Sequence, residues 1–224
     1  PQGIMDKLPS DIKALNLLDS CESPAFVQES VAIMGYVFNA QDNAEKWQEW
    51  HDRYFNEVAK RVATIPENKR VRVFVESSSM NDKQPSSRNA LGEGRAASNI
   101  VELAGGVNIA KGYFSKKMYG LWGSEGGKIE TEWVLSQNPD VIVGALQGNR
   151  PYEIKNNSIL QAYREQIMSL PGFDHVSAVK NNRVYIITND GSSSPVYPAA
   201  MIALAKWFYP DLFEDMDPLK AQQE

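Results

Sequence analysis

From residue 71 onward, strand-like and helix-like patterns alternate, and this alternation constrains the fold more than any other feature of the sequence. Val71 to Val75 and Arg183 to Ile187 have strand character, and Val141 to Ala145 is a fully apolar run of strand length. Fully apolar strands are typical of parallel sheets that are covered on both faces. Alternating strands and helices predict an α/β fold with three layers, a Rossmann-like arrangement around a central, mostly parallel sheet.

The segments between these strands have helical spacing. We expect helices over residues 94–104, 129–137, 158–169 and 197–208, and a short extended segment over residues 107–110. Long loops are expected over residues 77–91, 111–128, 146–156 and 188–195. Long loops inside a compact domain are usually functional, and those that follow parallel strands meet at one edge of the sheet.

Before residue 67 the pattern differs. A short apolar run over residues 13–19 has strand length, and Ser23 with Pro24 predicts the start of a helix that ends near Gly35. Asp42 and Glu45 resemble a capping box, which predicts a second helix from residue 42 to Ile65, stopped by Pro66. About 22 residues give a helix roughly 33 Å long, enough to cross a small domain.

Composition excludes several classes of function. The net charge of −5 argues against general nucleic-acid binding. Cys21 is the single cysteine, so no intramolecular disulfide and no CxxC metal site can form. His51 and His175 are the only histidines, which weakens a catalytic triad or a bare-metal site, and we expect His51 to be solvated or packed. We therefore predict no catalytic residues, no bound metal and no cofactor. No apolar run is long enough to span a membrane, and the chain does not open with a signal-peptide pattern.

Arginines and aromatic residues interleave in the expected loops. Guanidinium groups suit carboxylates and phosphates, and aromatic rings pack against flat ligand surfaces. The pattern therefore indicates an anionic, partly apolar ligand such as a metal chelate. Gly92 to Ala97 fits a dinucleotide-binding pattern only weakly, because no strand leads directly into it. The residues that we predict to face the ligand are Ser78, Arg88, Arg95, Trp122, Asn149, Arg150, Tyr152 and Tyr197.

Three blocks of sequence carry a resemblance to a known family. They are Glu102 to Ala110 (ELAGGVNIA), Asn138 to Val143 (NPDVIV) and Ala178 to Tyr185 (AVKNNRVY), in which Asn182 replaces a glycine. In this order and spacing they resemble the C-terminal lobe of class III periplasmic binding proteins, which deliver ferric siderophores, haem or vitamin B12 to ABC importers.

The resemblance implies two α/β lobes that are linked by a single long helix. Residues 1–41 would be a remnant of an N-terminal lobe, residues 42–66 the linking helix and residues 67–224 a complete C-terminal lobe. Most of the N-terminal lobe would be missing. The resemblance also implies that Glu132 docks onto the membrane permease.

The resemblance favours an extracytoplasmic protein, periplasmic or lipid-anchored at the cell surface, that captures a ferric siderophore, haem, cobalamin or an oxyanion. We expect a monomer whose partners are the chelate and the ABC permease, and which does not bind nucleic acid. Two alternatives remain open at this point. One is an enzyme on a nitrogenase-like α/β scaffold, and the other is a stand-alone ligand-sensing or interaction domain.

Overall fold

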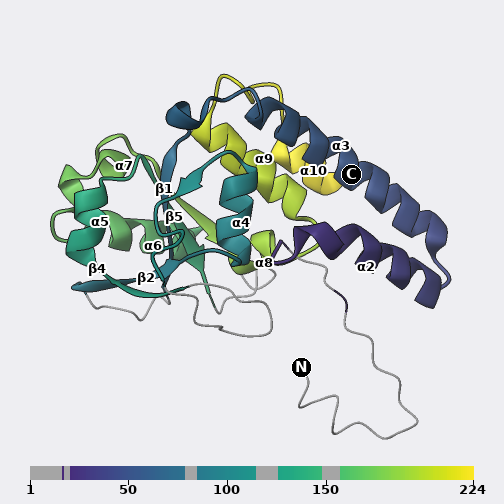
Figure 1. The fold of residues 1–224 in the computed structure, drawn as a ribbon, viewed down its shortest axis with the longest axis horizontal. Coiled ribbons are helices and arrows are strands. Elements are labelled where there is room, and N and C mark those ends of the chain that lie inside the picture. Colours follow the sequence, from purple (N-terminus) through teal and green to yellow (C-terminus); the bar gives the residue numbers. More distant parts are fainter. Residues whose placement is uncertain (1–16, 18–20, 79–84, 115–125, 148–156) are drawn as a thin grey trace, which may run out of the picture.

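The computed structural model describes residue 17 and residues 21–78, 85–114, 126–147 and 157–224. In this part of the chain the strands form a six-stranded sheet flanked by helices on both faces (Figure 1). The strands are β1 (Arg72–Ser78), β2 (Ser87–Leu91), β3 (Val107–Asn108), β4 (Gly126–Glu130), β5 (Val141–Leu146) and β6 (Val184–Thr188). The helices are α2 (Pro24–Val37), α3 (Gln41–Val62), α4 (Ala96–Leu103), α5 (Thr131–Gln137), α6 (Ser158–Met168), α7 (Ser177–Lys180), α8 (Asn189–Ser192), α9 (Tyr197–Phe208) and α10 (Pro218–Gln223).

The sheet has the strand order β4-β2-β1-β5-β6, and β3 pairs with the amino end of β1. The pairs β1–β5, β5–β6 and β1–β3 are parallel, whereas β1–β2 and β2–β4 are antiparallel. The expected mostly parallel α/β sheet is therefore confirmed. All six residues of β5 are buried, as a central strand covered on both faces requires.

Side-chain alternation along β5 divides the interior into two hydrophobic clusters. Val141, Val143 and Ala145 pack on the face covered by α3, α4 and α9, and Ile142 and Leu146 pack on the face covered by α6 and α7. Gly144 also belongs to β5. A Cβ atom there would lie 2.7 Å from Ile186 Cδ1 and 2.9 Å from Tyr163 Cε1, so the close approach of α6 to the sheet requires glycine.

Several expected boundaries were wrong because distant parts of the chain pair with each other. The expected loop over residues 77–91 contains β2, and the expected loop over residues 111–128 contains the first part of β4, with which β2 pairs. Ile129 and Glu130 belong to β4 and not to the helix that follows. The expected loop over residues 188–195 contains α8, and α10 was not predicted. The expected strand over residues 13–19 lies almost wholly outside the described residues.

The two N-terminal helices also differ from expectation at their ends. Helix α2 continues through Gly35 to Val37. Gly35 does not end the helix but packs against α3, and a Cβ atom on it would lie 2.7 Å from Ala44 Cβ. Helix α3 begins at Gln41, one residue before Asp42, and no side-chain capping hydrogen bond forms there. Together α2 and the first half of α3 form a helical hairpin that projects from the sheet-containing body (Figure 1).

Candidate functional site at the carboxyl edge of the sheet

Three parallel strands end side by side at one edge of the sheet. Ser78 at the end of β1 pairs with Leu146 of β5, and Leu146 pairs with Thr188 of β6. The chain leaves the sheet at these points into residues 79–84 and 148–156 and into α8. Ligands of open α/β sheets bind outside the carboxyl ends of the strands, so this edge is the candidate functional site.

A buried ion pair lies directly beneath this edge. The Arg88 guanidinium of β2 donates from Nε to Glu76 Oε2 at 2.8 Å and from Nη2 to Glu76 Oε1 at 2.6 Å. Tyr163 of α6 donates its hydroxyl hydrogen to the same Oε1 atom at 3.1 Å. The side chains of Arg88 and Glu76 are 1% and 0% exposed. Charges removed from water in this way are tolerated only when they are paired and hydrogen-bonded.

Glu76 and Tyr163 were not predicted as site residues. Glu76 is an acidic residue near the end of an apolar strand, which is a recognisable signal for a buried charge, but the sequence does not reveal its partner. Arg88, predicted to face the ligand, directs its guanidinium toward Glu76 inside the protein. Its role toward a ligand stays a prediction.

The structure places the other predicted ligand residues unevenly. Ser78 ends β1 at the carboxyl edge, and Arg95 precedes α4 as its half-buried N-cap. Helix α4 ends beside the amino end of β1, where Val107 N–H donates to Val71 O. Arg95, at the start of this helix, therefore lies toward the carboxyl edge of the sheet. Trp122, Asn149, Arg150 and Tyr152 lie outside the described residues.

Tyr197 is fully buried at the start of α9. Its hydroxyl lies 2.8 Å from His51 Nε2, and its ring packs edge-on against His51 and Phe55 of α3. Burial raises the pKa of Tyr197 above its usual value. In the described structure Tyr197 joins α9 to the long helix, and a ligand-facing role stays a prediction.

His51 lies at the junction of α2, α3 and α9 and is 3% exposed. Gln28 Nε2 of α2 lies 3.1 Å from His51 Nδ1, Asp52 Oδ1 lies 3.4 Å from the same nitrogen, and Nε2 faces the Tyr197 hydroxyl. Burial lowers the pKa of His51, and this effect outweighs the neighbouring Asp52 carboxylate, which acts in the opposite direction. We expected His51 to be either solvated or packed, and the structure shows it packed, in contacts that connect three helices.

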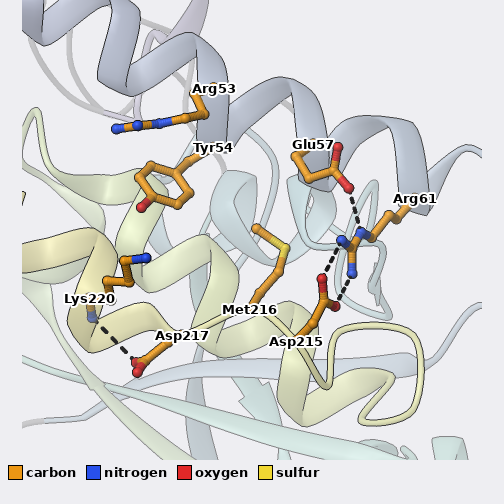
Figure 2. Close-up of a pocket in the computed structure, with 8 residues that line it drawn as sticks. All are labelled: Arg53, Tyr54, Glu57, Arg61, Asp215, Met216, Asp217 and Lys220. Carbon is orange, nitrogen blue, oxygen red and sulfur yellow. Dashed lines mark hydrogen bonds and ion pairs between the residues drawn. The ribbon is translucent and has the colours of Figure 1, made fainter.

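A second set of contacts attaches the C-terminal segment to α3 (Figure 2). Arg61 donates to both carboxylate oxygens of Asp215, at 2.5 and 2.9 Å, and to Glu57 at 2.8 Å. The Arg61 guanidinium lowers the pKa of Asp215 to about 2. Trp50 Nε1 donates to Ala221 O at 2.8 Å in the interior.

These contacts border a cavity of about 270 Å³ between α3 and the C-terminal segment. The lining residues are Arg53, Tyr54, Glu57, Arg61, Asp215, Met216, Asp217 and Lys220. Arg53 Nη2 donates to Glu224 at 2.6 Å, and the Asp217 carboxylate caps α10. Because acidic and basic groups here largely neutralise each other, we interpret the cavity as part of a helix attachment and not as a ligand site.

The described residues contain no group of three or more histidine, cysteine, aspartate or glutamate side chains that could hold a metal ion. None of the helices in the described ranges is long and apolar enough to cross a membrane.

A family model described as "Periplasmic binding protein" matches residues 2–190 of the sequence. The chain belongs to this family. Its members are extracytoplasmic substrate-binding proteins and not enzymes. They carry ligands, not cofactors. A comparison with curated proteins finds no significant match.

Solved structures show the same fold. The chain is similar to the TroA-like periplasmic binding protein FepB from Veillonella parvula, with 21% identity and a TM-score of 0.74, over 99% of this chain and 62% of that one. It is also similar to a periplasmic heme-binding protein from Pseudomonas aeruginosa, with 16% identity, a TM-score of 0.70 and coverage of 94% and 68%.

Molybdate-bound MolA from Haemophilus influenzae is a third similar structure, with 19% identity, a TM-score of 0.62 and coverage of 92% and 56%. The chain thus spans less than two thirds of the length of FepB and of MolA. At these identities the likeness establishes the fold alone.

The buried ion pair leads to a stability prediction. Glu76→Ala removes the carboxylate that pairs with the buried Arg88 charge, so we expect a loss of about 3–5 kcal/mol in the free energy of unfolding, measured by urea denaturation. The double variant Glu76→Leu with Arg88→Met removes both charges and should lose less than Glu76→Ala. Arg53→Ala, which breaks an exposed pair with Glu224, should cost at most about 1 kcal/mol. Equal losses in Glu76→Ala and Arg53→Ala would contradict this account.

His51 should make stability depend on pH. Its pKa in the folded protein lies below that of the unfolded chain, so the unfolded state binds the proton more readily. Its contribution to stability is present above about pH 6.5 and is lost as pH falls toward the lowered pKa. In urea unfolding across this pH range, the free energy of unfolding should change less steeply with pH in His51→Gln than in the native protein. His175→Gln should retain the native slope, because the His175 side chain is 80% exposed. A slope that is unchanged in His51→Gln would contradict the assignment.

Proposed function

We propose that the protein captures a metal chelate or a related cofactor, of the ferric siderophore type, outside the cytoplasm for delivery to an ABC importer. The observation that carries the proposal is the family match over residues 2–190, within which β1, β5 and β6 end together at the carboxyl edge. Solved proteins with this fold include one named for heme binding and one bound to molybdate, so chelates and oxyanions are the first ligands to test.

The proposed ligand contacts are those expected from the sequence. Arg95 and Arg150 would supply positive charge, Trp122, Tyr152 and Tyr197 flat apolar surface, and Ser78 and Asn149 neutral hydrogen bonds. Arg88 would act from its position beside Glu76, with which it forms an ion pair. Arginine forks and aromatic faces together suit a ligand that is anionic at its periphery and flat or apolar in its body.

The proposed domain organisation has a C-terminal lobe over residues 67–224, a linking helix over 42–66 and a remnant of another lobe over 1–41. The surface of α2 supports it. Phe26, Tyr36 and Phe38, in and just after this helix, are 50%, 73% and 74% exposed, although Val27 and Val31 on the other face are buried. A helix that is apolar on two faces is typical of an element packed between two layers. A further lobe against α2 would cover these rings.

Glu132 is proposed as a contact to the permease. It is exposed in the first turn of α5 and is therefore accessible to a partner. We propose that the protein acts as a monomer, free in the periplasm or tethered by a lipid anchor at the cell surface.

A thermal-shift screen tests the ligand class. The chain, with any sequence that precedes it in the natural protein, is heated with ferric siderophores, haem, cobalamin and oxyanions. A ligand that binds only the folded state raises Tm, and the stabilisation grows with the logarithm of the ratio of ligand concentration to Kd. We expect one ligand class to raise Tm, and Arg150→Ala to abolish the rise. Lys60→Ala, on the exposed side of α3, is the charge-matched control and should keep it. No rise with any of these compounds would reject the ligand class and favour a stand-alone interaction domain.

The docking proposal is tested separately from ligand binding. Glu132→Lys reverses a charge at the proposed contact, so it should abolish ligand-dependent stimulation of ATP hydrolysis by the cognate importer while leaving the ligand's Kd unchanged. Glu165→Lys makes the same change at an exposed position of α6 and should stimulate as the native protein does. Native-level stimulation by Glu132→Lys would reject Glu132 as a docking residue.

A further inference from the structure

A groove runs along the outer side of β6, separate from the three aligned strand ends. Its volume is about 350 Å³, within the lower range of small-molecule sites. Its lining includes Leu160, Gln161 and Arg164 of α6, Tyr185 and Ile186 of β6, and Trp207 of α9. Ile186 packs with the cluster under α6 and Tyr185 with the cluster under α9, so the groove wraps around the edge of the sheet.

Strand β6 ends the strand order of the described sheet, and its pairing shows which groups face outward. Ile142 N–H donates to Arg183 O, so the carbonyl of Arg183 faces β5 and the N–H and C=O groups of Val184 face away. Arg164 Nε donates to the outward-facing Val184 O at 2.8 Å. The alternation of a strand then directs the N–H and C=O groups of Ile186 into the groove as well.

The apolar part of the groove is held in a fixed shape. The rings of Tyr185 and Trp207 are stacked, with centroids 4.5 Å apart and planes 5° apart. Arg183 Nη2 donates to Trp207 O at 3.1 Å and to Phe208 O at 3.0 Å, which fixes the end of α9 against β6. Leu160 and Ile186 complete an apolar surface suited to a flat ligand body.

Arg164 supplies the groove with an oriented positive charge. A guanidinium has five N–H donors. Arg164 uses Nε for Val184 O and one Nη2 hydrogen for Asn182 Oδ1 at 2.6 Å, and within the described residues nothing accepts from Nη1. The lining contains no aspartate or glutamate. The guanidinium is therefore held in place while three N–H donors remain for an anion, two on Nη1 and one on Nη2, and carboxylates match this geometry best.

We propose that this groove is a second binding site, which takes a small planar carboxylate. The carboxylate accepts hydrogen bonds from Arg164 Nη1, and the flat body lies against Trp207, Tyr185 and Leu160. The site is independent of the proposed chelate site, since its residues lie beside β6 and not beyond the aligned strand ends.

Benzoate is a suitable probe, and benzamide is its uncharged control of the same shape. The protein is titrated with each while the indole N–H signals of its five tryptophans are followed in proton–nitrogen correlation spectra. The signal of Trp207 is identified by its loss in Trp207→Phe. Benzoate should shift this signal with millimolar affinity, as a fragment of this size allows, and benzamide should bind at least about tenfold more weakly.

The matched variants are Arg164→Gln and Lys180→Gln, each of which removes one positive charge. Arg164→Gln should weaken benzoate binding at least about tenfold and leave benzamide unchanged, whereas Lys180→Gln, outside the groove lining, should bind benzoate as the native protein does. If Arg164→Gln does not fold, the benzoate and benzamide titrations of the native protein decide. A Trp207 signal that does not move with benzoate, or that moves equally with benzamide, would overturn the proposal. Neither result affects the chelate screen, since Arg150→Ala tests that site alone.

Discussion

The parallel pairing of β1 with β5 is the constraint on which the rest of the structure depends. Six consecutive residue pairs, from Val73 with Val141 to Ser78 with Leu146, fix the two strands in register. A shift by one residue would exchange the side chains that β5 presents to the two faces, so that a side chain would replace Gly144 against Tyr163 and both hydrophobic clusters would have to repack. The same register brings the ends of β1, β5 and β6 to one edge, so the packing of the core determines where a ligand site can form.

The sequence predicts the elements that depend on local pattern. Strands β1, β5 and β6 and helices α4, α6 and α9 follow from runs such as Val141 to Ala145 and from helical spacing, and α9 was predicted at its observed ends. Asn182, which replaces a glycine in the AVKNNRVY block, has a φ of 59°, and asparagine is the residue that best replaces glycine in this region. The glycine position of this block therefore corresponds to a turn with a positive φ, and asparagine can adopt that backbone conformation in place of glycine.

What the sequence does not predict depends on partners that are distant along the chain. Ser87 to Leu91 and Gly126 to Glu130 have weak strand patterns and become strands because each pairs with the other. Glycine at position 35 predicts a helix end, yet Gly35 lies inside α2. Ala44 of α3 occupies the space that a Cβ atom would need, so this glycine allows the two helices to pack and does not end the first one. The same limit applies to the candidate site, where Arg88 was recognised as significant but its partner Glu76 was not.

The long helix α3 is attached to the body along most of its length, and this affects how any lobe joined through α2 can move. Near its middle His51 contacts Tyr197 and Trp50 contacts Ala221, and near its end Arg61 binds Asp215. Separating α3 from the body would expose the buried Trp50 and His51 side chains and leave hydrogen-bonding groups without partners. Helix α2 shares this attachment, because Val27 and Val31 are buried and Gln28 contacts His51. Turning α2 about the bend at Asn39, which has a φ of 52°, would break these contacts as well, so a lobe joined through α2 is expected to move with α3 and the body.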